Sequence, residues 1–154
     1  MKKTNNNGFS LVELIIVIAI MAVLIGVLAP QFLKYVERSR NSTDVQNAQE
    51  IVTALQTYAA DPEATVVPAS GSLTFGASVS TPNDFAKAAL IDAGLADASG
   101  NVATRCKSKT AWDSYTVSWT VDANGTILFT YSSKKGNADT TAFTDLMAGK
   151  TKAE

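Results

Sequence analysis

The stretch Gly8-Phe9-Ser10-Leu11-Val12-Glu13-Leu14, which opens an apolar run ending at Ala29-Pro30, decides how this chain is organised. Phe9 to Ala29 makes 21 residues, and Glu13 is the one charged residue among them. As a helix rising 1.5 Å per residue, this stretch would measure about 31 Å, which matches a hydrocarbon core about 30 Å thick. The sequence therefore predicts a helix that can span a membrane.

Two ordinary explanations compete for this segment. A cleavable signal peptide would fit the basic start at Lys2 and Lys3, but the apolar run is longer than a usual signal core. Its best small-residue site, Val27-Leu28-Ala29, is followed directly by Pro30, which makes a poor cleavage site. A plain membrane anchor explains the length of the run but does not explain Glu13.

Glu13 needs a partner, because an ionised carboxylate in a membrane segment costs about 2.5–3.5 kcal/mol at the helix centre. No Lys or Arg lies between Phe9 and Ala29. A cut between Gly8 and Phe9 would create an α-ammonium four residues before Glu13, on the same chain or on a neighbouring one. The alternative is that Glu13 only favours a helix start at the membrane surface.

These residues resemble the prepilin signature of type IV pilins and pseudopilins. The resemblance implies that Gly8 precedes the cut made by prepilin peptidase and that Phe9 becomes the N-methylated first residue. It also implies that Glu13 is the assembly glutamate and that Pro30 kinks the long helix. Gly26, four residues earlier, weakens the same stretch. The signature covers only the first thirty or so residues.

After Pro30 the helical pattern continues. Apolar residues recur at three- and four-residue spacing, with charged residues such as Glu37 and Asp44 between them, which is typical of an amphipathic helix with one face against a domain. We expect one helix from Phe9 to about Ala60, stopped by Asp61-Pro62. The residues expected on the apolar face are Phe32, Tyr35, Val36, Ser39, Val45, Ala48, Val52, Leu55, Tyr58 and Ala59.

The remaining residues predict a small globular head. A short helix is expected to be capped by Thr81 and to end at Gly94. Alternation predicts two strands joined by the three-residue loop 123–125, which pairs Val121 with Ile127 and places the apolar rows on one face. A further strand is needed, and the candidates are Val102–Lys109 and Phe143–Met147, the second of which could equally form a terminal helix.

The predicted fold class is α+β, a long N-terminal helix packed on a small antiparallel sheet. The predicted parts are a leader (1–8), the transmembrane or filament-core half of the helix (9–30), its amphipathic half (31–60) and the head (61–154).

Composition argues against catalysis. The chain has no histidine and a single cysteine, Cys106, so the commonest general base is missing and no intramolecular disulfide can form. We expect no enzyme activity, no cofactor and no metal; the residues 122–125 are better explained by a hairpin than by a calcium loop. Four lysines are candidates for contact with DNA or a surface, although a solvated face explains them as well: Lys107, Lys109, Lys134 and Lys135.

The resemblance implies a structural subunit of a type IV pilus, polymerised through its N-terminal helix. Its partners would be further copies of itself, prepilin peptidase, the pilus assembly machinery and, before assembly, the membrane. The precursor would lie in the cytoplasmic membrane and the product on the cell surface. Adhesion, motility and DNA uptake stay open, as do two alternatives: a pseudopilin of a secretion or competence system, and a membrane-anchored exported binding domain.

Overall fold

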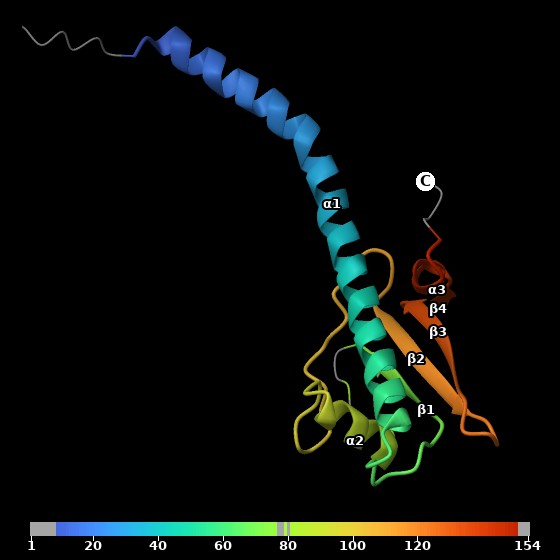
Figure 1. Ribbon diagram of the computed structural model, residues 1–154. Coiled ribbons are helices and arrows are strands. Elements are labelled where there is room, and N and C mark those ends of the chain that lie inside the picture. Colours follow the sequence, from blue (N-terminus) through green and yellow to red (C-terminus); the bar gives the residue numbers. More distant parts are fainter. Residues whose placement is uncertain (1–8, 77–78, 80, 151–154) are drawn as a thin grey trace, which may run out of the picture. The chain divides into compact units, whose positions relative to one another are not determined.

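A computed structural model describes residues 9–76, 79 and 81–150 of the chain (Figure 1). In chain order the elements are α1 (Leu11–Ala60), β1 (Gly71–Phe75), α2 (Asp84–Asp92), β2 (Ser114–Val121), β3 (Ile127–Lys135), β4 (Ala138–Thr140) and α3 (Ala142–Met147). Contacts divide the chain into two compact units, one ending at Val36 and the other beginning at Glu37, and α1 contributes to both. The fold class is α+β, as predicted.

The long helix α1 ends at Ala60, as predicted, but starts at Leu11 instead of Phe9. Ser10 stands just before the helix, and its carbonyl accepts the first helical hydrogen bond from the Leu14 N–H at 3.2 Å. A serine in this position suits a helix start, which accounts for the shorter helix.

The buried face of α1 differs from the predicted one. Ile51 is buried, whereas Val45 and Val52 are only partly buried. Phe32 and Tyr35 were expected on the apolar face but are 66% and 64% exposed. The buried residues recur mainly at alternating steps of four and three, which keeps them on one side of a helix: Asp44, Ala48, Ile51, Ala54, Leu55 and Tyr58.

The head is built on a four-stranded antiparallel sheet in the order β1-β2-β3-β4. The predicted register between β2 and β3 is confirmed, because Val121 pairs with Ile127. The Asp122 N–H donates to the Thr126 carbonyl at 3.0 Å, which leaves a three-residue loop. Gly125 has a φ of 81° there, a conformation that glycine adopts without strain.

A further strand joins the hairpin, as predicted, but neither candidate segment forms it. Val102–Lys109 contributes only an isolated bridge at Val102. Phe143–Met147 lies in α3, which confirms the alternative of a terminal helix. The neighbour of β2 is instead β1, which buries Leu73 and Phe75. Residues 73–75 alternate in polarity, but this five-residue strand sits in a stretch rich in proline and glycine, so the sequence alone does not predict a strand there.

The cap of α2 also differs from the prediction. Asn83, not Thr81, is the N-cap: its backbone is extended and its Oδ1 accepts the Ala86 N–H at 2.8 Å. Asparagine is a good cap, and it directly precedes the helix. The predicted end is confirmed, since Gly94 follows the helix with a φ of 71°.

Aromatic rings fill the core at one end of the sheet. Tyr115 of β2 stacks between Phe75 and Phe143, with ring centroids 4.7 and 4.4 Å away. Trp112 meets the edge of Phe143 at 5.3 Å. All four side chains are fully buried, so β1, β2, α3 and the segment before β2 share one core.

Candidate assembly site and the carboxylates of α1

Glu13 lies exposed in the first turn of α1. Its Oε2 accepts the Ser10 backbone N–H at 2.9 Å, so within one subunit the carboxylate satisfies a donor at the helix start. This contact fits the helix-start alternative for Glu13. A carboxylate can accept about four hydrogen bonds, however, so the contact does not use up its capacity for a second group.

The predicted cleavage point lies at the limit of the described chain. Gly8 and the leader 1–8 lie outside the described residues. Phe9 precedes α1 and is 87% exposed. Cleavage after Gly8 and methylation of Phe9 therefore stay predictions.

The first unit exposes its apolar side chains. From Phe9 to Tyr35, the exposed fractions of the large apolar residues run from 45% at Val17 to 87% at Phe9. The most apolar part of α1 is long enough to cross a membrane, a test that a signal sequence near the N-terminus also passes, and none of it is buried. Monomeric soluble proteins rarely expose contiguous apolar patches larger than a few hundred Å². This surface therefore needs lipid or other helices to cover it.

Gly26 and Pro30 both lie inside α1. The helix continues through Pro30, although proline removes one backbone hydrogen bond. A Cβ added at Gly26 would meet nothing within 4 Å, so no close approach within the described chain requires glycine there. The proposed kink at these residues stays a prediction.

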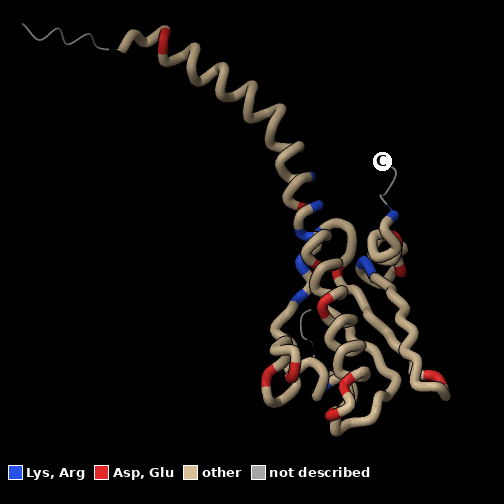
Figure 2. The backbone as a smooth tube through the Cα atoms, in the orientation of Figure 1, with Lys and Arg blue, Asp and Glu red and all other residues tan. Residues whose placement is uncertain are grey.

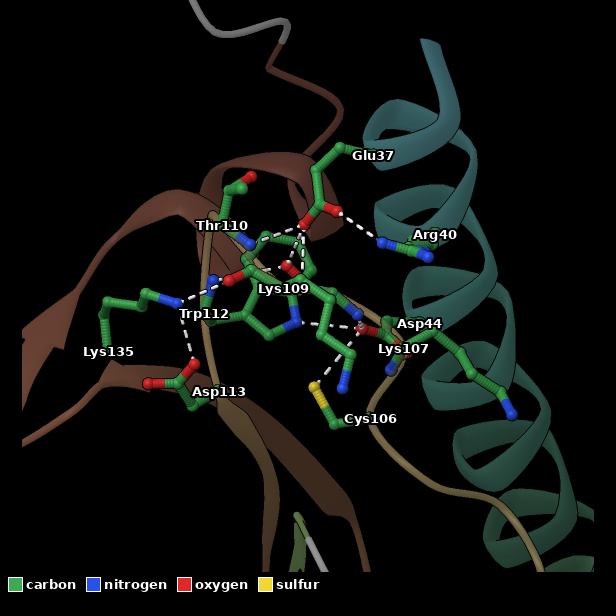
Figure 3. Close-up of polar contacts among 11 residues, drawn as sticks. Glu37, Arg40, Asp44, Cys106, Lys107, Lys109, Thr110, Trp112, Asp113 and Lys135 are labelled. Carbon is green, nitrogen blue, oxygen red and sulfur yellow. Dashed lines mark hydrogen bonds and ion pairs between the residues drawn. The ribbon is translucent and has the colours of Figure 1, made fainter. Parts of the chain in front are cut away.

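In the second unit, Asp44 of α1 is fully buried and holds the segment before β2 (Figure 3). Its carboxylate accepts the backbone N–H groups of Lys107 at 2.8 Å and Ser108 at 3.0 Å. It also accepts the Trp112 indole N–H at 2.9 Å and lies 3.5 Å from the Cys106 sulfur. A buried carboxylate is tolerated when donors surround it in this way.

Glu37 binds the same segment at residues 108–110 (Figure 3). Its Oε1 accepts the Ser108 hydroxyl at 2.9 Å and the backbone N–H groups of Thr110 and Lys109, while Oε2 lies 3.3 Å from Arg40 Nη1. Burial raises the pKa of Glu37, but the N–H donors of Thr110 and Lys109 and the Ser108 hydroxyl outweigh it and lower the pKa to about 2. Glu37 therefore remains ionised in all but strongly acidic solution.

The sequence predicts that Glu37 and Asp44 lie between the apolar positions of α1, away from its buried face. For Asp44 this prediction is wrong, because its side chain is fully buried. Helical spacing carried the signal: Asp44 precedes Ala48 by four residues and Ile51 by seven, and Glu37 lies seven before Asp44. Residues seven apart share a helix face. A carboxylate in line with a buried stripe predicts donors from another segment.

The four candidate lysines separate into two pairs. Lys107 and Lys109 are exposed on the segment held by Glu37 and Asp44. Lys135 Nζ contacts Asp113 Oδ1 at 2.7 Å, and Lys134 Nζ lies 3.7 Å from Asp139 Oδ1. The charge of the second pair is therefore partly compensated by Asp113, just before β2, and by Asp139 of β4.

Cys106 is a poor candidate for reactivity. Burial, the charge of Asp44 and a hydrogen bond to Asp44 together raise the pKa of the thiol to about 12. The nucleophilic form is the thiolate, which is scarce at neutral pH when the pKa is so high. Within the described part of the chain, no group of three His, Cys, Asp or Glu could hold a metal ion.

Comparison with known proteins points to the N-terminal segment. The family model described as the prokaryotic N-terminal methylation motif matches residues 3–29. The chain is 38% identical over 53 residues to the type IV major pilin protein PilA of Myxococcus xanthus, which covers 34% of this chain and 24% of the relative. It is 36% identical over 59 residues to the type IV major fimbrial protein FimA of Dichelobacter nodosus, 38% of each chain. The matches thus span well under half of these relatives, and no solved structure matches the chain.

A long helix that exposes its apolar first half and builds its second half into a small α+β head defines a helix-anchored subunit. The methylation motif and the similarity to type IV major pilins lie at this same end, and together they support a type IV pilin-like chain, of the pilin or pseudopilin kind.

Proposed function

We propose that the chain is the structural subunit of a type IV pilus, polymerised through the first half of α1. The observation that carries this proposal is the exposed apolar surface from Phe9 to Leu33. In a filament the helices of neighbouring subunits bury this surface, which removes apolar area from water at about 25 cal/mol per Å². The names of the similar proteins, a major pilin and a major fimbrial protein, favour a pilus over a secretion pseudopilin.

Glu13 would set the register between subunits. In the precursor it accepts the Ser10 N–H of its own chain. After cleavage at Gly8, the α-ammonium of Phe9 on a neighbouring subunit provides a cation for this carboxylate in an apolar environment. An ion pair there fixes how far one helix slides past the next, because separated charges among apolar side chains are costly.

This function implies two locations and three kinds of partner. The precursor is held in the cytoplasmic membrane by α1, where prepilin peptidase cuts after Gly8 and methylates Phe9. The assembly machinery then moves the subunit into an extracellular filament of identical copies.

The test is the N-terminal residue of the protein purified from its native host, together with electron microscopy of the cell surface. We expect a chain beginning with N-methylated Phe9 and fibres that contain it. Replacing Gly8 with a bulky residue is expected to leave a full-length precursor, whereas Gly8→Ala serves as the conservative control. A native chain that still begins with Met1 and occurs as a monomer would contradict the proposal.

A further inference from the structure

We propose that the head carries a binding site for the phosphate groups of anionic membrane lipids, formed by Arg40 of α1 with Lys107 and Lys109. These residues line an open groove of about 470 Å³ together with Ser39, Thr43 and Cys106. Lys107 and Lys109 are exposed, and the side chain of Arg40 is 44% exposed. Figure 2 shows basic residues gathered where this part of α1 and the segment before β2 lie.

Hydrogen bonds to α1 fix the backbone that carries the two lysines of this site. The N–H groups of both residues are bound by carboxylates of α1: Lys107 by Asp44 and Lys109 by Glu37. The segment is therefore held against the helix that supplies Arg40 (Figure 3). Cations on a fixed segment lose less entropy when they bind an anion than cations on a free loop.

Three carboxylates lie close to these three cations, and all are engaged. Asp113, whose charge interacts with Lys109, pairs with Lys135 at 2.7 Å. Asp44 is fully buried among its donors. Glu37 directs Oε1 at the segment and Oε2 at Arg40. The exposed groups that remain for a ligand are predominantly cationic, so an anion is the ligand that this groove suits.

The position of the groove along the chain favours a membrane as the source of that anion. The exposed apolar surface ends near Leu33 and Tyr35, and tyrosine is enriched at membrane interfaces. Six residues separate Leu33 from Ser39, about 9 Å as a helix and at most about 21 Å in any conformation. The headgroup layer beyond the hydrocarbon core is about 5–8 Å thick on each side. The connection from Leu33 is therefore short enough for this groove to reach the headgroups of a membrane that holds the first half of α1.

The charge distribution supports the same conclusion. Basic residues are usually concentrated on the cytoplasmic side of a membrane segment. If the leader is cytoplasmic, this cluster lies on the opposite side, where the usual bias gives no reason for it. Anionic lipids in the leaflet on that side would give one, and by analogy with the cytoplasmic leaflet each basic residue close to an anionic surface strengthens binding about fivefold.

The site rests on the membrane-held precursor proposed above, and one experiment separates the two. The full chain is incorporated into nanodiscs of phosphatidylcholine or of phosphatidylcholine with phosphatidylglycerol. The rates at which an acylating reagent modifies Lys107 and Lys109 are then measured by mass spectrometry. Lys87 on α2 is the internal reference, because α2 contacts Tyr58, about 27 Å along α1 from Arg40.

We expect the anionic lipid to slow modification of Lys107 and Lys109 several-fold relative to Lys87, and high salt to abolish this protection. Arg40→Gln should weaken the protection about fivefold, while Arg40→Lys, which keeps the charge, and Lys134→Gln, which removes a cation elsewhere, should retain it.

Equal modification rates in both kinds of disc would overturn the site while leaving the membrane-held precursor intact. Protection in phosphatidylcholine discs by added inorganic phosphate would assign the groove to free phosphate instead. Protection there that grows with protein concentration would assign it to a second copy of the chain. A chain that does not enter the discs contradicts the precursor and this site together.

Discussion

The two halves of α1 differ in what their hydrogen-bonded carboxylates contact. In the half before Glu37, Glu13 is exposed and accepts a hydrogen bond only three residues away, from Ser10. In the half from Glu37 onward, Glu37 and Asp44 bind donors more than sixty residues away in sequence. One helix thus carries two carboxylates whose hydrogen bonds fold their own chain. It carries a third, Glu13, which can still accept a hydrogen bond from another group.

The largest expected effect comes from removing the acid of the first half. Glu13→Ala should abolish filaments while leaving processed subunit in the membrane, because the neighbouring α-ammonium loses its partner. Fibres are counted by electron microscopy and the subunit is followed on gels. Glu13→Gln, of matched size, tests whether the charge itself is needed. Normal piliation by either variant would remove the role proposed for this residue.

Removing the buried acid of the second half should unfold the head instead. Asp44→Ala leaves the buried Trp112 indole N–H and the Ser108 N–H without an acceptor, and we expect a loss of about 3–4 kcal/mol. Thermal unfolding followed by near-ultraviolet circular dichroism measures this loss. Glu50→Ala, an exposed acid on the same helix, should change stability by less than about 0.5 kcal/mol. Similar losses in the two variants would contradict the anchoring role of Asp44.

The contribution of Glu37 to the stability of the fold should depend on pH. Its folded-state pKa of about 2 lies below its ordinary value of 4.5, so the unfolded chain binds more protons between these values. This stability is therefore fully present above about pH 4.5 and is lost as the pH falls towards 2. Glu37→Gln should cost about 1–2 kcal/mol at neutral pH and flatten the pH dependence in that window. An unchanged acid profile in the variant would show that the carboxylate does not titrate as described.

The smallest expected effect lies wholly in the head. Asn83→Ala removes the cap of α2 and should cost about 1 kcal/mol, with no effect on filament assembly beyond that loss. Thr81→Ala is the matched control, since Thr81 is the cap that the sequence predicted. A larger loss for Thr81→Ala than for Asn83→Ala would favour the sequence prediction over the structure.

Features of the fold that neighbouring residues determine could be predicted from the sequence, whereas contacts between distant parts of the chain could not. The end of α1 at Ala60 and the pairing of Val121 with Ile127 follow from neighbouring residues, and both are confirmed. β1 was missed because a short strand between proline- and glycine-rich loops is identified only by the strand that it pairs with. The donors around Asp44 lie more than sixty residues away in sequence, so spacing could indicate that Asp44 is buried but could not say what binds it.

The protected state of Cys106 has a practical consequence for watching this protein at work. Because its thiol is held protonated against Asp44, maleimide dyes should react with it slowly. A second cysteine introduced at Leu128, which is 59% exposed on β3, would then be the fast-labelling position of the described chain. Fluorescent subunits could thus be followed in living cells without first mutating the native residue.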